Sequence, residues 1–143
     1  MFRFNLETLL RLRIQEEEQQ LLKFSESTRM LQEEEAKLTA LKEMETRYTE
    51  EYRVKQQQGV DLAELTIYRN FFRRLSQELL EQMDAIRKAQ EYQGKCRQDL
   101  IDATKKKKIL ETLKAHQFTA WRKEQNMKET KLLDEVAITR FGK

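Results

Sequence analysis

The sequence predicts an all-α protein in which two long helices form an antiparallel coiled-coil hairpin. Charged residues make up 37% of the 143 residues, against about 25% in average domains, and this excess is typical of long helices. The chain has no proline and only three glycines, so few positions interrupt a helix. Apolar residues recur every three or four positions in two stretches, which is the spacing of a coiled-coil seam. Together these observations favour long helices over a compact enzyme.

The first helix is expected from about residue 5 to residue 57. Glu17, Thr28 and Glu45 are expected to take seam places that lack an apolar side chain. The apolar seam residues are Leu10, Ile14, Leu21, Phe24, Leu31, Leu38, Leu41, Tyr48 and Tyr52.

The second helix is expected from about residue 62 to residue 139. Gly94 lies inside it, and there we expect either a mild bend or a close approach of the two helices. The seam residues are Leu65, Tyr68, Phe72, Leu75, Leu79, Ile86, Ala89, Cys96, Leu100, Ala103 and Leu110.

A turn at about residues 58 to 61 joins the two helices. Gly59 suits the left-handed conformation that ends a helix, and Asp61 with Glu64 has the spacing of a capping box that begins the next one. So short a connection makes the helices antiparallel neighbours. We therefore expect residues 1–143 to form a single helical-hairpin domain.

The second helix is longer than the first, so we expect it to lack a partner within the chain from about residue 115. Residues 105–143 hold eleven Lys or Arg and five Asp or Glu, which indicates docking to an acidic partner. Within the run Lys105 to Lys108, we expect lysines to reach carboxylates among residues 16–18 across the seam.

Aromatic residues gather near the turn. Tyr48 and Tyr52 are expected opposite residues 70 and 66, and Phe71 should project partly outward because it adjoins a seam position. Exposed rings beside a polar rim are typical of protein-binding patches. Plain packing of the hairpin tip is the equally weighted alternative.

The sequence lacks the residues that common active sites need. The glycines are isolated, His116 is the single histidine, and Cys96 is the single cysteine, so we expect no phosphate-binding loop, metal site, cofactor or catalytic residue. We also expect no nucleic-acid partner, because a recognition fold and a stacking platform are missing. No secretory signal or membrane span is expected, and the predicted location is the cytoplasm.

The two ends of the chain resemble the FliJ family, a soluble coiled-coil component of the bacterial flagellar type III export apparatus. The opening FRFNLETLLRLRIQEEE resembles the family's F-x-F-x-L-x-x-L-L-x-x-R start. The closing KILETLKAHQFTAWRKEQNMKETKLLDEVAITRF resembles its L-E-x-L-K … L-D-E-x-A-x-x-R-F end. The resemblance covers essentially the whole chain.

This resemblance implies a stalk-like hairpin that binds the ring of the flagellar export ATPase and the transmembrane export gate. It also implies handling of export chaperones, and peripheral association with the export apparatus at the inner membrane. The gate-binding patch would comprise Tyr48, Tyr52, Phe71 and Leu75. For the ATPase-facing basic region, charge selects Arg122, Lys123, Lys128, Lys131 and Arg140.

Two other functions predict the same periodicity. One is a structural coiled-coil protein whose unpaired extensions associate in a homodimer. The other is the equivalent component of a virulence-type secretion system.

Overall fold

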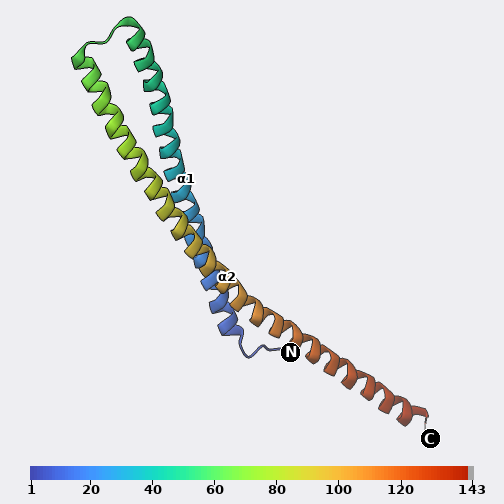
Figure 1. The fold of residues 1–143 in the computed structure, drawn as a ribbon. Coiled ribbons are helices and arrows are strands. Elements are labelled where there is room, and N and C mark those ends of the chain that lie inside the picture. The colour runs from blue at the N-terminus through green and yellow to red at the C-terminus, as the bar shows by residue number, and fades with distance from the viewer. Residues whose placement is uncertain (142–143) are drawn as a thin grey trace. The chain divides into compact units, whose positions relative to one another are not determined.

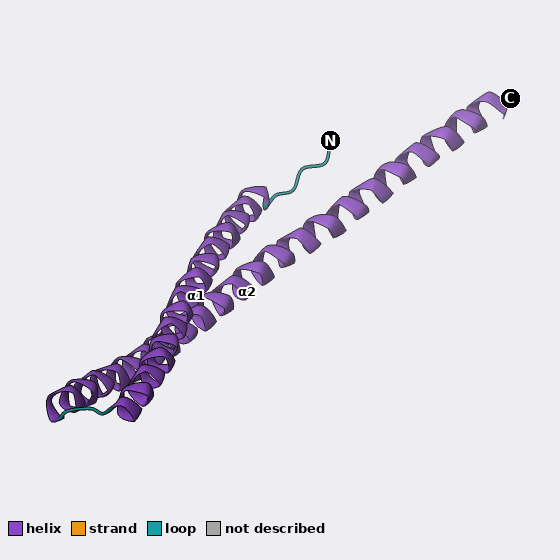
Figure 2. Ribbon diagram, turned by 90° about the horizontal axis from the view of Figure 1, so that it is seen from above, coloured by secondary structure: helices purple, strands orange, loops and turns teal. Residues whose placement is uncertain are grey.

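A computed structural model describes residues 1–141, and these residues are almost entirely helical. Helix α1 runs from Glu7 to Gln58 and α2 from Leu62 to Phe141 (Figure 1). Figure 2 shows the non-helical parts as loops, namely the residues before α1 and the connection between the helices. The described residues contain no strand. The two helices pack against each other, so the predicted all-α antiparallel hairpin is confirmed.

The connection between the helices begins at Gly59, whose φ of 102° lies in the region that favours glycine. Asp61 caps the start of α2, because its side-chain Oδ1 accepts a hydrogen bond of 2.8 Å from the Glu64 backbone N–H. The Glu64 carboxylate lies 3.7 Å from the ammonium of Lys55 in α1. The predicted cap is therefore present in Asp61, while Glu64 contacts the opposite helix.

The contacts divide the chain into two compact units, and each contains parts of both helices. We call residues 21–99 the hinge unit, and residues 1–20 together with the described residues from 100 onward the terminal unit. The single helical-hairpin domain stays a prediction.

In the hinge unit, apolar and polar layers share the seam. Leu31, Leu75 and Cys96 are buried there. The Gln82 amide donates to the Glu34 carboxylate at 2.6 Å and to the Glu34 backbone carbonyl at 2.8 Å. The Gln93 amide donates to the Thr28 hydroxyl at 3.1 Å. These polar layers pair groups that would otherwise lose their hydrogen bonds with water.

Two residues predicted in the α1 seam lie outside it. Leu21 is 51% exposed, and Glu45 is exposed while Met44 is half-buried. The buried side of α1 instead includes Ser27, which is 1% exposed, and Glu34. The hydrogen bonds from Gln82 hold the Glu34 side chain toward α2. The side of α1 that faces α2 therefore includes polar residues that neighbour the predicted seam positions.

In the terminal unit, Phe4, Leu10 and Leu110 form the buried core, with Phe2, Leu9 and Ile14 packed against it. Two ion pairs of 2.8 Å join the helices beside this core. One links Lys107 to Glu17 and the other links Lys114 to Glu7. The predicted contact between the lysine run and residues 16–18 is thus present.

The stretch of α2 without a partner begins later than residue 115. The ring of Phe2 lies 5.3 Å from the ring of Phe118 and 5.9 Å from that of Trp121. The chain before α1 is not helical, and a non-helical residue can span about 3.3 Å instead of the 1.5 Å of a helix. The N-terminal residues therefore reach farther along α2 than a helix of equal length.

The two described glycines should respond oppositely to alanine. At Gly94 an added Cβ would meet nothing within 4 Å, which rules out the close helix approach considered above. Gly94→Ala should therefore raise the free energy of unfolding by about 0.5–1 kcal/mol. Gly59→Ala should lower it by about 1–2 kcal/mol, because alanine is strained at that φ. Urea denaturation of both variants measures the difference, and equal effects would contradict it.

Candidate protein-binding surfaces

The aromatic residues near the turn form one continuous cluster in the hinge unit. We call Tyr48, Tyr52, Tyr68, Phe71 and Phe72 the hinge-end cluster. The rings of Tyr48 and Phe71 lie 4.7 Å apart, and those of Tyr52 and Tyr68 lie 4.9 Å apart. Tyr52 and Phe72 lie 5.9 Å apart. All three distances join α1 to α2, so these rings hold the tip of the hairpin closed.

The predicted gate-binding residues differ in their exposure. Tyr48, Tyr52 and Phe71 are half-buried, so each has surface in the seam and surface in solvent. Leu75 is 3% exposed, and a partner could not contact it without opening the hairpin. The structure thus brings three of the four residues to the surface and places the fourth beneath it. Their role in binding stays a prediction.

Charged side chains border the hinge-end cluster. The Arg47 guanidinium lies 5.7 Å from the centre of the Tyr48 ring, and the Tyr68 hydroxyl donates to Glu51 at 3.3 Å. Burial raises the pKa of Tyr68, and the Glu51 charge raises it further. The hydroxyl therefore stays protonated at neutral pH and keeps donating to Glu51.

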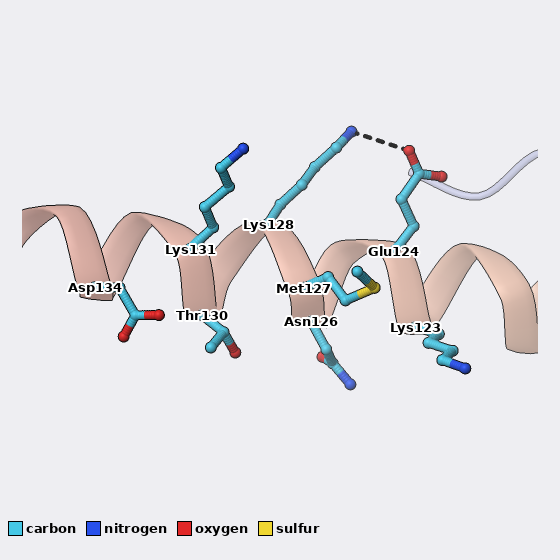
Figure 3. Close-up of a pocket in the computed structure, with 8 residues that line it drawn as sticks. All are labelled: Lys123, Glu124, Asn126, Met127, Lys128, Thr130, Lys131 and Asp134. Carbon is cyan, nitrogen blue, oxygen red and sulfur yellow. Dashed lines mark ion pairs between the residues drawn. The ribbon is translucent and has the colours of Figure 1, made fainter.

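The second candidate surface is residues 122–141 of α2, which we call the terminal segment. Every residue in it is exposed, including Arg122, Lys123, Lys128, Lys131 and Arg140, which were selected by charge. Lys128 forms an ion pair of 3.5 Å with Glu124 (Figure 3). The groove in Figure 3 is lined by side chains of this single helix and is open to solvent.

The terminal segment is less basic than the whole of residues 105–143. It holds five Lys or Arg and four Asp or Glu. The denser positive charge lies at 105–114, where Lys107 and Lys114 are already paired with acidic residues of α1. A partner of the terminal segment must therefore match a mixed pattern of charges.

Charge-based reasoning missed the exposed apolar residues of the terminal segment. The adjacent leucines at 132 and 133 could have indicated this apolar surface in the sequence, because two adjacent residues cannot both lie in a coiled-coil seam. The exposed apolar side chains are Met127, Leu132, Leu133, Val136, Ile138 and Phe141. A helix with this much exposed apolar surface and no packing is marginal in water.

Within residues 1–141, no group of three or more His, Cys, Asp or Glu residues could hold a metal ion. No helix in the same range has the length and apolar character needed to cross a membrane.

The fold defines a class of protein: an α-helical hairpin in which the end of the longer helix is exposed. A comparison with protein families finds that the family model described as flagellar FliJ protein matches residues 2–143. The chain belongs to the FliJ family, as its two ends indicated. It is accordingly a component of the flagellar export apparatus, which favours the flagellar system over the virulence-type alternative. No curated protein and no solved structure matches the chain.

One ion pair of the terminal unit has a predictable effect on stability. The hydrogen bond from Lys107 lowers the pKa of Glu17 below its ordinary 4.5, and the same bond raises the pKa of Lys107 above 10.5. The depressed Glu17 pKa contributes stability above pH 4.5 that is lost as pH falls through the folded-state value. The raised Lys107 pKa contributes stability below pH 10.5 that is lost as pH rises through its folded-state value.

Lys107→Met should therefore lower the urea midpoint between about pH 5 and pH 10 and should change it less at lower pH. Lys105→Met is the matched control, because Lys105 is exposed. Urea titrations at pH 7 and pH 3 measure the two effects. A Lys107→Met effect of the same size at both values would contradict the role of the ion pair.

Proposed function

We propose that this chain binds the flagellar export ATPase ring through its terminal segment and the export gate through its hinge-end cluster. The hairpin between the two surfaces couples or promotes ATPase assembly and export. This function requires no catalysis by the chain itself. It places the protein in the cytoplasm, beside the export apparatus at the inner membrane, and the same surfaces are available to export chaperones.

The terminal segment carries the first half of the proposal. About five turns of helix consist of exposed residues only, and both apolar and charged side chains face solvent there. Packing on a host surface would supply the stabilisation that an isolated helix lacks. Family membership supports the export ATPase as this host.

The hinge-end cluster supports the second half. Tyr48 and Phe71 contact each other across the seam while remaining half-exposed, so they present rigid aromatic surface with little entropy left to lose on binding. Arg47 lies beside them and adds a cation to the rim. Aromatic anchors bordered by Arg have the composition of binding hot spots.

The hairpin itself supports a coupling role. Aromatic packing closes its tip, and ion pairs with an apolar core join the helices of the terminal unit. The hinge-end cluster thus lies on a pair of packed helices, and the terminal segment continues directly from such a pair. A protein that binds at either surface would act on regular helical structure and not on a loop.

Ending the chain after Arg122 tests the ATPase half. This truncation removes most of the terminal segment and keeps Phe2, Phe118 and Trp121, so the hairpin should melt at nearly the same temperature. Binding to the purified ATPase and stimulation of its ATP hydrolysis should both be lost. Stimulation equal to that of the full chain would overturn this half of the proposal.

A full-length variant with five glutamines separates charge from apolar contact. It replaces the five selected cations of the terminal segment: Arg122, Lys123, Lys128, Lys131 and Arg140. Affinity for the ATPase should fall, and the remaining binding should depend less on salt than binding of the unchanged protein. An unchanged salt dependence would exclude these cations from the contact.

Tyr48→Ala and Phe71→Ala test the gate half. Each should weaken binding to the soluble part of the gate protein by about tenfold, because each removes an aromatic anchor. ATPase stimulation should persist. Ile67→Ala is the control, since this side chain is near the tip and 67% exposed. The gate assignment fails if Ile67→Ala weakens binding as much as Phe71→Ala does. Circular dichroism checks that each variant keeps its helices.

A further inference from the structure

The terminal segment carries a stripe of four residues on the side of the helix opposite the continuation of the seam. The α2 seam residues Ala103, Leu110 and Trp121 are buried or half-buried, and the same three-four spacing continues through residues 124, 128, 131 and 135. In Figure 3, Glu124, Lys128 and Lys131 point to one side of the helix, whereas Asn126 and Thr130 point to the other.

Leu133 and Arg140 follow Asn126 by seven and fourteen residues, so they lie on that second side. Glu129 and Val136 lie beside Leu133 and Arg140 on the same side of the helix. We call Glu129, Leu133, Val136 and Arg140 the outer stripe. Leu133 is 67% exposed and Val136 is 50% exposed.

The order and spacing of the outer stripe are symmetric. Its steps are four, three and four residues, with an acid at one end, a base at the other and two aliphatic residues between them. An antiparallel copy would place Leu133 against Val136 and Glu129 against Arg140, and the twofold axis would repeat both contacts. A parallel copy would place each charge against its own kind.

The charged side chains at the two ends of the outer stripe, Glu129 and Arg140, are available for such a contact. Neither Glu129 nor Arg140 forms an ion pair with another residue of 1–141, whereas Lys128 on the seam side is paired with Glu124. Both are exposed.

The antiparallel alignment also leaves room for both hairpins. Residue 128 of one copy would lie opposite residue 141 of the other, so the overlap is confined to the terminal segments. Trp121, whose ring contacts Phe2, would lie beyond the end of the partner's described helix. The hairpins therefore do not compete for the shared space.

We propose that the outer stripe is a self-association surface at which two copies of this chain pair antiparallel. The pairing covers two aliphatic residues and two charges per copy, less than a standard stable interface. It is a weak, reversible dimer with a Kd on the order of 100 µM. The proposal does not rest on the function proposed above, since it requires no partner other than the chain itself.

A charge-reversal experiment tests the proposed pairing and its direction. Sedimentation equilibrium of the full chain should show a concentration-dependent dimer. Glu129→Arg alone and Arg140→Glu alone should each weaken the dimer by about tenfold, because each creates two like-charge contacts. An equimolar mixture of the two variants should dimerise again, since every contact between them is then of opposite charge. Glu135→Arg makes the same charge change on the seam side and should leave the dimer unchanged.

Three results would overturn the proposal. The first is a full chain that stays monomeric up to about 1 mM, and the second is a dimer unaffected by Glu129→Arg. The third is a mixture that associates no better than each variant alone, with circular dichroism showing intact helices. ATPase binding is measured separately on the same variants, so failure of the dimer and failure of the proposed function are distinguishable.

Discussion

The reversal of the chain at residues 59–61 is the constraint on which the other features depend. The positive φ of Gly59 ends α1, and the side chain of Asp61, two residues later, caps α2. Because the connection is this short, α2 must return directly along α1. The contacts of Tyr52 with Tyr68 in the hinge unit, and of Leu10 with Leu110 in the terminal unit, both follow from that return. So does the surplus length of α2, which creates the terminal segment.

Polar layers within the seam give the pairing its specificity. A purely apolar seam can slide by a heptad at small cost, whereas a buried polar group that loses its partner costs free energy. Gln82 with Glu34, Gln93 with Thr28 and Lys107 with Glu17 each span the two helices. A shift of one heptad would separate all three pairs. Stability thus comes from Leu31, Leu75 and their neighbours, while register is fixed by the polar pairs.

The sequence was sufficient for the helices, their turn and the contact between the lysine run and Glu17, because these depend on local periodicity and on chain reversal. It was insufficient where a neighbour distant in sequence decides the outcome. Leu21 and its neighbour Gln20 both fit a heptad spacing, but Gln20 is half-buried while Leu21 is exposed, because the position of α2 selects which side of α1 is buried. Phe2 lies before the predicted start of the first helix and no contact was predicted for it, yet the non-helical N-terminal residues carry it as far as Trp121. Net charge was a poor guide to the terminal segment for a different reason: lysines at 107 and 114 are neutralised within the fold.

The composition of the terminal segment sets how its partners are selected. Five cations beside four anions give little long-range attraction, so recognition depends on matching individual charges and apolar side chains at short range. The outer stripe and the basic residues selected for ATPase binding share Arg140. Under the two proposals, a second copy and the ATPase therefore compete for the same helix by mass action. A self-dimer weaker than host binding would cover Leu133 and Val136 only while no host is present, and would release them as soon as one is available.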